Sequence, residues 1–152
     1  MTDLSKGIIE IEGVVLSKNT CANDFINLNN PNIDVKISKR GHTYINFLNP
    51  IVFNDIAMFV KVACYTNSDV PEIKLFPSIP PSVVDHGYGE IPKYKLDAAK
   101  QWLKGMINSE PKTSNDSCVF YKFDDVDYFS SISEDIHYGL IGGEINITFH
   151  GA

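Results

Sequence analysis

Residues 33–48 decide the fold class, and they read Ile-Asp-Val-Lys-Ile-Ser-Lys-Arg-Gly-His-Thr-Tyr-Ile-Asn-Phe-Leu. Apolar and polar side chains alternate from Ile33 to Ser38, which is the period of a strand with one face against a core. The Gly-containing segment 39–42 then permits a tight connection to a second strand over 43–48. The stretch therefore predicts a β-hairpin, and with it an antiparallel sheet.

Strand patterns recur on both sides of this hairpin. The run 56–65 is apolar and rich in branched and aromatic residues, so it predicts a central strand buried on both faces. In 144–149 Ile145, Ile147 and Phe149 face one way and the polar residues the other. The predicted strands are 7–16, 33–38, 43–48, 56–65, 72–76, 118–123 and 144–149, with a shorter segment at Tyr128-Phe129.

Turn and loop chemistry fills the gaps between these strands. The Asn-rich segment 19–32 predicts a loop with at most one helical turn, and 77–92, with four prolines, predicts a long loop. Residues 111–117 predict a surface connection. The segment 140–143, Leu-Ile-Gly-Gly, predicts the turn into the last strand.

One amphipathic helix is predicted over about 95–107. Its apolar stripe follows helical spacing, while its other face is basic. The stripe consists of Leu96, Ala99, Leu103, Met106 and Ile107. Many strands and one principal helix predict an α+β fold with a mainly antiparallel sheet.

Length and composition narrow the class of protein. A chain of 152 residues with 43% hydrophobic residues predicts a single globular domain over 1–152. The apolar runs are about five residues long, whereas a bilayer span needs about 20. The start of the chain has no export signal, which favours the cytoplasm. Three widely spaced cysteines, Cys21, Cys64 and Cys118, then predict reduced thiols without a zinc or redox motif.

The formal net charge of −6 comes from the last quarter of the sequence. Residues 1–115 carry equal numbers of basic and acidic side chains, while residues 116–152 carry one lysine and seven acids. Such an asymmetry favours a basic protein partner or a metal and disfavours nucleic acid. Five of the acids lie between positions 124 and 135: Asp124, Asp125, Asp127, Glu134 and Asp135.

Three interpretations fit this acidic segment. It is a solvated connection, a docking face for a cationic protein, or a calcium site. An EF-hand spacing is absent, so no metal and no cofactor is predicted. The favoured hypothesis is a non-catalytic docking face, in which aromatic anchors matter more than peripheral charges. Its predicted contact residues are Asp124, Asp125, Asp127, Tyr128, Phe129, Glu134, Asp135, His137 and Tyr138.

Two other classes stay open. A hydrolase or metal-dependent enzyme could use Asp135 to orient His137, which would share one face of a strand with it, together with Glu144 or the loop around His86. His42 paired with His137 could imitate a ribonuclease, although the acidic surroundings would repel RNA. A structural subunit that pairs its sheet edge with another copy is the remaining alternative.

Two stretches carry a resemblance. Residues 96–104 read Leu-Asp-Ala-Ala-Lys-Gln-Trp-Leu-Lys, and Asp135-Ile136-His137-Tyr138-Gly139 is followed by Gly142-Gly143-Glu144-Ile145. Together they resemble small bacterial proteins that act as immunity partners in toxin systems, over about a third of the chain. The resemblance implies a cytoplasmic, non-catalytic inhibitor that binds a cognate toxin domain. It transfers no functional residue by position.

Overall fold

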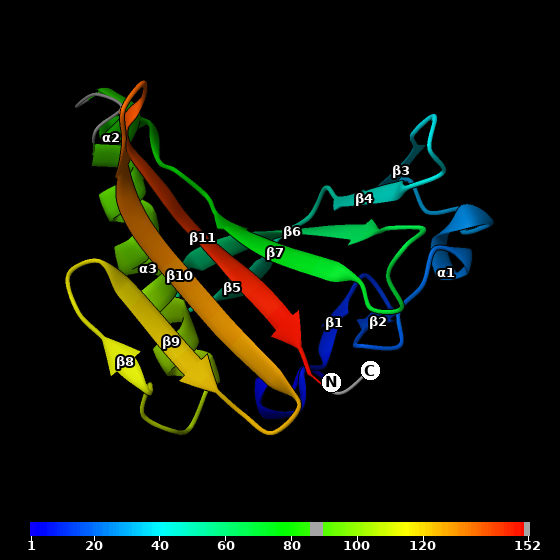
Figure 1. Ribbon diagram of the computed structural model, residues 1–152, viewed down its shortest axis with the longest axis horizontal. Coiled ribbons are helices and arrows are strands. Elements are labelled where there is room, and N and C mark those ends of the chain that lie inside the picture. The colour runs from blue at the N-terminus through cyan, green and yellow to red at the C-terminus, as the bar shows by residue number, and fades with distance from the viewer. Residues whose placement is uncertain (86–89, 151–152) are drawn as a thin grey trace.

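The computed structural model describes residues 1–85 and 90–150, and it has the predicted α+β fold (Figure 1). Its main sheet is antiparallel, in the order β3-β4-β6-β7-β11-β10-β9-β8, and β5 pairs with β6 beside this path. The strands are β1 (Ile9–Ile11), β2 (Val14–Leu16), β3 (Ile33–Ile37), β4 (Thr43–Phe47), β5 (Ile51–Phe53), β6 (Ile56–Cys64), β7 (Glu72–Pro77), β8 (Thr113–Ser114), β9 (Cys118–Lys122), β10 (Val126–Asp135) and β11 (Gly139–Phe149). The helices are η1 (Leu4–Lys6), α1 (Asn23–Ile26), α2 (Pro81–Asp85) and α3 (Glu90–Met106).

The β3–β4 hairpin forms in the predicted register, from Ile33 opposite Phe47 to Ile37 opposite Thr43. β6 lies between β4 and β7, but the prediction that it is buried on both faces is wrong. Lys61 in its middle is exposed, because only one face of this part of the sheet is covered. β5 was not predicted, since three residues are too few to show a period.

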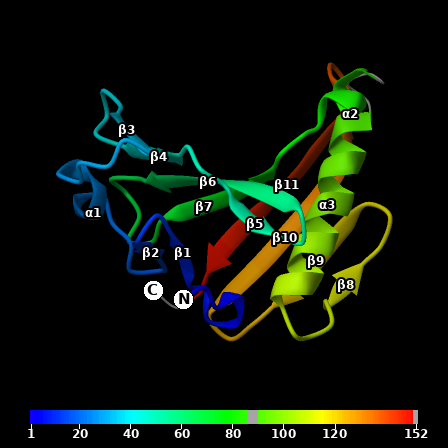
Figure 2. The same cartoon turned by 180° about the vertical axis from the view of Figure 1, so that it is seen from behind.

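The core lies on one face of the main sheet. Directly opposed residues share a face in an antiparallel sheet, and one such row is buried from end to end. The row runs Tyr128, Ile147, Ile73, Val62, Ile45. Figure 2 shows α3 and the β1–β2 hairpin on the same side of the sheet, where they cover this face.

The helix α3 starts earlier than the prediction of about 95. It begins at Glu90, so Pro92 lies in its first turn, where a missing backbone N–H leaves no hydrogen bond unmade. The apolar stripe packs as predicted, with Leu96, Ala99 and Leu103 buried. The segment 77–92 is therefore not one long loop, because α2 and the start of α3 lie within it.

The N-terminal strand prediction is also corrected. Residues 7–16 form a hairpin of β1 and β2, not one strand, because the chain reverses at Glu12 and Gly13. Both residues have positive φ, 54° and 76°, as a two-residue type I′ turn requires. The Asn-rich segment contains the single helical turn α1.

The largest difference lies in the last third of the chain. The predicted turn at 140–143 is part of strand β11, and the predicted short segment at Tyr128-Phe129 is part of the ten-residue β10. The register shifts between the pairs Ser130–Ile145 and Ile132–Gly142, so that two residues of β11 oppose Ser131. This irregularity is a β-bulge. It accounts for Gly142 and Gly143 inside a strand, so the chain does not need to turn at these two positions.

Gly143 is required in the bulge for two reasons. Its φ is 98°, and a Cβ atom there would lie 2.4 Å from Cβ of Lys95 and 2.9 Å from the carbonyl oxygen of Pro92. Glycine thus lets α3 approach β11 closely. In residues 1–85 and 90–150, no helix has the length and apolarity needed to span a bilayer.

Candidate protein-binding site

Beyond the bulge, β10 and β11 leave the sheet as a two-stranded arm, defined here as residues 132–142 (Figure 1). β10 pairs with β9 only as far as Ser131, and β11 pairs with β7 only from Ile145 onward. In the arm the two strands pair with each other as far as Asp135 opposite Gly139, while the backbone N–H of Ile132 at its base donates a hydrogen bond to the carbonyl oxygen of Ser117, at 2.9 Å. Four residue pairs at about 3.3 Å each give the arm a length of about 13 Å.

The tip of the arm exposes two large apolar side chains. Ile136 is 97% exposed and Tyr138 is 82% exposed. A carboxylate oxygen of Asp135 accepts hydrogen bonds from the backbone N–H groups of His137, at 2.8 Å, and Tyr138, at 3.1 Å. Gly139 closes the turn with φ of 74°. The turn is therefore held by its own hydrogen bonds while its apolar side chains face solvent.

The acidic residues do not form one surface. Glu134 and Asp135 lie at the arm, while Asp124 and Asp125 lie in the turn between β9 and β10, at the other end of β10. The ten residues of β10 separate the two groups by about 30 Å. The acids of the docking face predicted from the sequence therefore form two separate groups.

Two of the predicted contact residues are turned away from solvent. Tyr128 is 0% exposed because the alternation of β10 places it on the covered face of the sheet. Burial raises the pKa of its phenol, with a smaller contribution from the charge of Asp3. The side chain of Asp127 is 15% exposed and lies 2.8 Å from Nε2 of His150. The prediction of Tyr128 as an interface anchor is therefore wrong.

Phe129 lies on the uncovered face of the sheet, where it is partly exposed. Its ring packs edge-on against Phe120 of β9, with 6.0 Å between the centroids. It is far along β10 from the arm tip, so Phe129 and Tyr138 do not belong to one compact contact surface.

The arrangement expected for an acid–base pair is absent from the arm. Asp135 is the last residue of β10 and His137 lies in the turn, so the two do not share a strand face. The Asp135 carboxylate contacts the backbone of His137, not its ring. Glu144 lies at the bulge on β11, and His86 falls outside the described residues.

The other polar candidates are also separated. His42 lies in the β3–β4 connection, where its Nδ1 accepts a hydrogen bond from the N–H of Thr66, far along the sheet order from His137. Within 1–85 and 90–150, no three His, Cys, Asp or Glu side chains are grouped as metal ligands would be. Asp124, Asp125 and Asp127 thus do not form such a group.

Sequence reasoning missed Ile136, the most exposed large apolar residue of the arm. The sequence does contain an indication that Ile136 is unusual. Isoleucine is rare in tight turns, and here it stands between an aspartate and a histidine. Comparisons of the chain with protein-family models, with curated proteins and with solved structures found no match.

Proposed function

We propose that this chain is a non-catalytic protein-binding module that contacts a basic protein through the tip of the arm. The observation that carries the proposal is the near-complete exposure of Ile136 and Tyr138 on a hairpin that projects from the sheet. Aromatic and large apolar side chains with this exposure are typical anchors of protein interfaces.

The ordered turn supports this role. Binding through a loop costs free energy when side chains and backbone must be fixed. The two hydrogen bonds to Asp135 already hold the backbone of the tip in the free protein. A partner with an apolar pit would therefore lose less free energy to ordering the backbone of the tip when it buries Ile136 and Tyr138.

The negative charge of the arm determines which kind of partner the tip favours. Glu134 and Asp135 place negative charge next to the anchors, which favours a partner with a basic rim and accelerates its association. Asp124 and Asp125 lie about 30 Å from the tip, several times the Debye length of about 8 Å at physiological salt. They contribute little to this contact.

More specifically, we propose that the chain is an immunity protein, which neutralises a cognate toxin domain in the bacterial cytoplasm. Its support is the resemblance of 96–104 and 135–145 to such proteins. The exposed tip of the arm, which lies beside α2 in Figures 1 and 2, adds a physical means of inhibition, because its apolar side chains can contact and block a basic cleft of a toxin.

A photo-crosslinking experiment tests the contact surface. A benzophenone amino acid replaces Tyr138 in one variant and Val52 of β5, which is 62% exposed, in a matched control. We expect one protein to crosslink through position 138 in the native cell and not through position 52. Equal crosslinking at both positions, or none at 138, would overturn the proposal.

Binding of the identified partner then gives the energetics. The variant Ile136→Ser/Tyr138→Ser should bind about 1,000-fold more weakly, since two anchors of about 2 kcal/mol each are lost. The control Val15→Ser/Val52→Ser removes two other exposed apolar residues, which are 55% and 62% exposed, and should stay within about twofold.

Association kinetics test the role of charge. Glu134→Gln should slow association in low salt and flatten its salt dependence, while Asp124→Asn/Asp125→Asn should leave the rate unchanged. If both variants associate at the wild-type rate, the arm does not attract a basic partner.

A further inference from the structure

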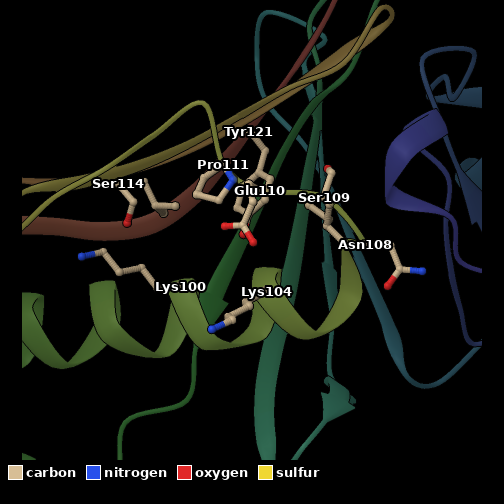
Figure 3. Close-up of a pocket in the computed structure, with 10 residues that line it drawn as sticks. Lys100, Lys104, Asn108, Ser109, Glu110, Pro111, Ser114 and Tyr121 are labelled. Atoms are coloured by element: carbon tan, nitrogen blue, oxygen red, sulfur yellow. The ribbon is translucent and has the colours of Figure 1, made fainter.

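A second candidate site lies between the C-terminal half of α3 and the β8–β9 hairpin (Figure 3). It is an open cavity of about 470 Å³, within the range of small-molecule sites. Its polar lining comes from the helix, from the segment that follows it and from the hairpin: Lys100, Lys104, Asn108, Ser109, Glu110, Ser114 and Tyr121. The cavity is separate from the arm and lies at the β9 end of the covered sheet face, since Tyr121 is directly opposite Tyr128.

One side of the cavity carries two ammonium groups. Lys100 and Lys104 are one helical turn apart, so they lie on the same face of α3. Lys100 Nζ donates a hydrogen bond to the carbonyl oxygen of Asn115, in the β8–β9 turn, which ties the helix to the hairpin. Within the described chain, neither lysine has a carboxylate within 4.0 Å. Both positive charges are therefore available to a ligand.

The opposite side carries a carboxylate. Glu110 follows α3, and Figure 3 shows its side chain directed toward the helix across the cavity. In the part of the chain that the structure describes, it makes no ion pair. Glu110 and Tyr121 both line the cavity, and the pKa of Tyr121 is raised by burial and, to a lesser extent, by the charge of Glu110. The cavity is thus lined by two ammonium-bearing side chains from the helix and by one carboxylate from the segment after it, with no ion pair between them among the described residues.

The remaining wall is apolar. Ile107 and Val119 are buried side chains that line the cavity, and Pro111 closes it next to Glu110. Hydroxyl groups of Ser114 and Tyr121 add possible hydrogen bonds. A ligand with two opposite charges and a short apolar part would satisfy each of these surfaces.

We propose that this cavity binds a small zwitterion of the α-amino acid class. Its carboxylate lies between Lys100 and Lys104, its ammonium group faces Glu110, and its side chain contacts Ile107 and Val119. A simple anion would meet the charge of Glu110, and a simple cation would meet two lysines. The zwitterion alone pairs both charges.

Titration of the full chain tests this assignment. Ligand-observed NMR identifies which of the common L-amino acids bind, and calorimetry compares an apolar one, L-leucine, with 4-methylpentanoate and isopentylamine, which lack its ammonium and carboxylate groups respectively. We expect L-leucine to bind and both analogues to bind at least 10-fold more weakly. Absence of L-leucine binding would overturn the proposal even if another amino acid bound, because the apolar wall of the cavity would then have no role. Equal binding of the analogues would also overturn it.

Variants separate the two charged sides. Lys104→Gln should weaken L-leucine binding about 10-fold, and Glu110→Gln should abolish the preference over 4-methylpentanoate. Lys112→Gln removes a nearby exposed lysine that does not line the cavity, so it should bind as wild type. Wild-type affinity in both Lys104→Gln and Glu110→Gln would place the binding elsewhere. Circular dichroism confirms that each variant is folded.

Discussion

The phenol hydroxyl of Tyr128 donates a hydrogen bond of 2.5 Å to the backbone carbonyl oxygen of Leu4, a residue 124 positions earlier in the chain. The bond is buried, and it joins strand β10 to the N-terminal helix η1. The carbonyl of Leu4 also accepts a hydrogen bond from the backbone N–H of Gly7, at 3.1 Å, so the phenol supplies one of two hydrogen bonds to this oxygen.

Removing the hydroxyl should therefore cost stability without changing the shape of the core. We expect Tyr128→Phe to lower the free energy of unfolding by about 0.5–1.5 kcal/mol, the net contribution of one hydrogen bond, because the N–H of Gly7 still pairs with the carbonyl of Leu4. Urea denaturation measures the loss. Tyr44→Phe is the control, since Tyr44 is partly exposed and should change stability by less than about 0.5 kcal/mol. Equal losses in both variants would contradict the assignment.

Tyr128 should also make the free energy of unfolding depend on pH in the alkaline range. The pKa of Tyr128 is raised in the folded protein, mainly by burial, so the folded state holds its proton more tightly than the unfolded state. The stability it contributes is complete below the ordinary tyrosine pKa of about 10 and is lost as pH rises above it. Tyr128→Phe should thus show a smaller fall in stability above pH 10 than wild type. A parallel fall in both proteins would exclude Tyr128 as a source.

Gly105 of α3 should resist a substitution that helix propensity favours. Alanine in a helix interior is more stable than glycine by about 1 kcal/mol, but a Cβ at Gly105 would lie 2.1 Å from the ring of Phe53. We expect Gly105→Ala to lower the free energy of unfolding by about 1–3 kcal/mol, because the ring must shift.

A double variant identifies the cause. In the Phe53→Ala background the clash is gone, so the added Gly105→Ala should be neutral or stabilising in thermal denaturation. If Gly105→Ala destabilises both backgrounds equally, the ring of Phe53 is not the obstacle.

The order of the arm tip should depend on the carboxylate of Asp135. We expect Asp135→Ala to speed hydrogen exchange of the His137 and Tyr138 amides about fivefold, since each loses a hydrogen bond of about 1 kcal/mol. Asp135→Asn keeps an acceptor oxygen and should exchange nearly as wild type. NMR measures both, and unchanged exchange in Asp135→Ala would show that the turn is held in another way.

Cys64 should react slowly with alkylating reagents. Burial, with smaller contributions from Cys21 and Asp24, raises the pKa of its thiol to about 11 from an ordinary value of 9.0. Because the thiolate is the nucleophile, at pH 8 Cys64 should react with iodoacetamide about 100-fold more slowly in the folded protein than in urea. Mass spectrometry of the labelled peptides measures this ratio. A ratio near one would mean that Cys64 is open to solvent and reagent.

Sequence reasoning predicted the elements whose pattern is local. The alternation in 33–38 and in 144–149 gave β3 and the end of β11, because one face of each strand meets the core. The stripe of Leu96, Ala99 and Leu103 gave α3 for the same reason. Its start at Glu90 was missed because Pro92 also signals a loop, and proline is tolerated in a first helical turn.

The candidate site was predicted only in part, since its geometry depends on contacts distant in sequence. Gly142 and Gly143 look like a turn locally, but the approach of α3 makes them a bulge in a strand. The alternation that buries Tyr128 depends on η1 and α3, which cover one face. The acids at 124–127 and 134–135 are close in sequence, yet an extended strand separates them.

The pairing of β7 with β11 also has a consequence for synthesis on the ribosome. β3, β4, β6 and β7 can assemble early, but one edge of β7 meets its partner only when Ile147 can lie opposite Ile73. At a synthesis rate of 5–20 residues per second, this edge of β7 stays unpaired for roughly 4–15 s, the time needed to add the residues from Ile73 to Ile147. A nascent chain stalled between these strands would expose Ile73 and Leu75 on an open, apolar edge, which makes it a substrate for holding chaperones.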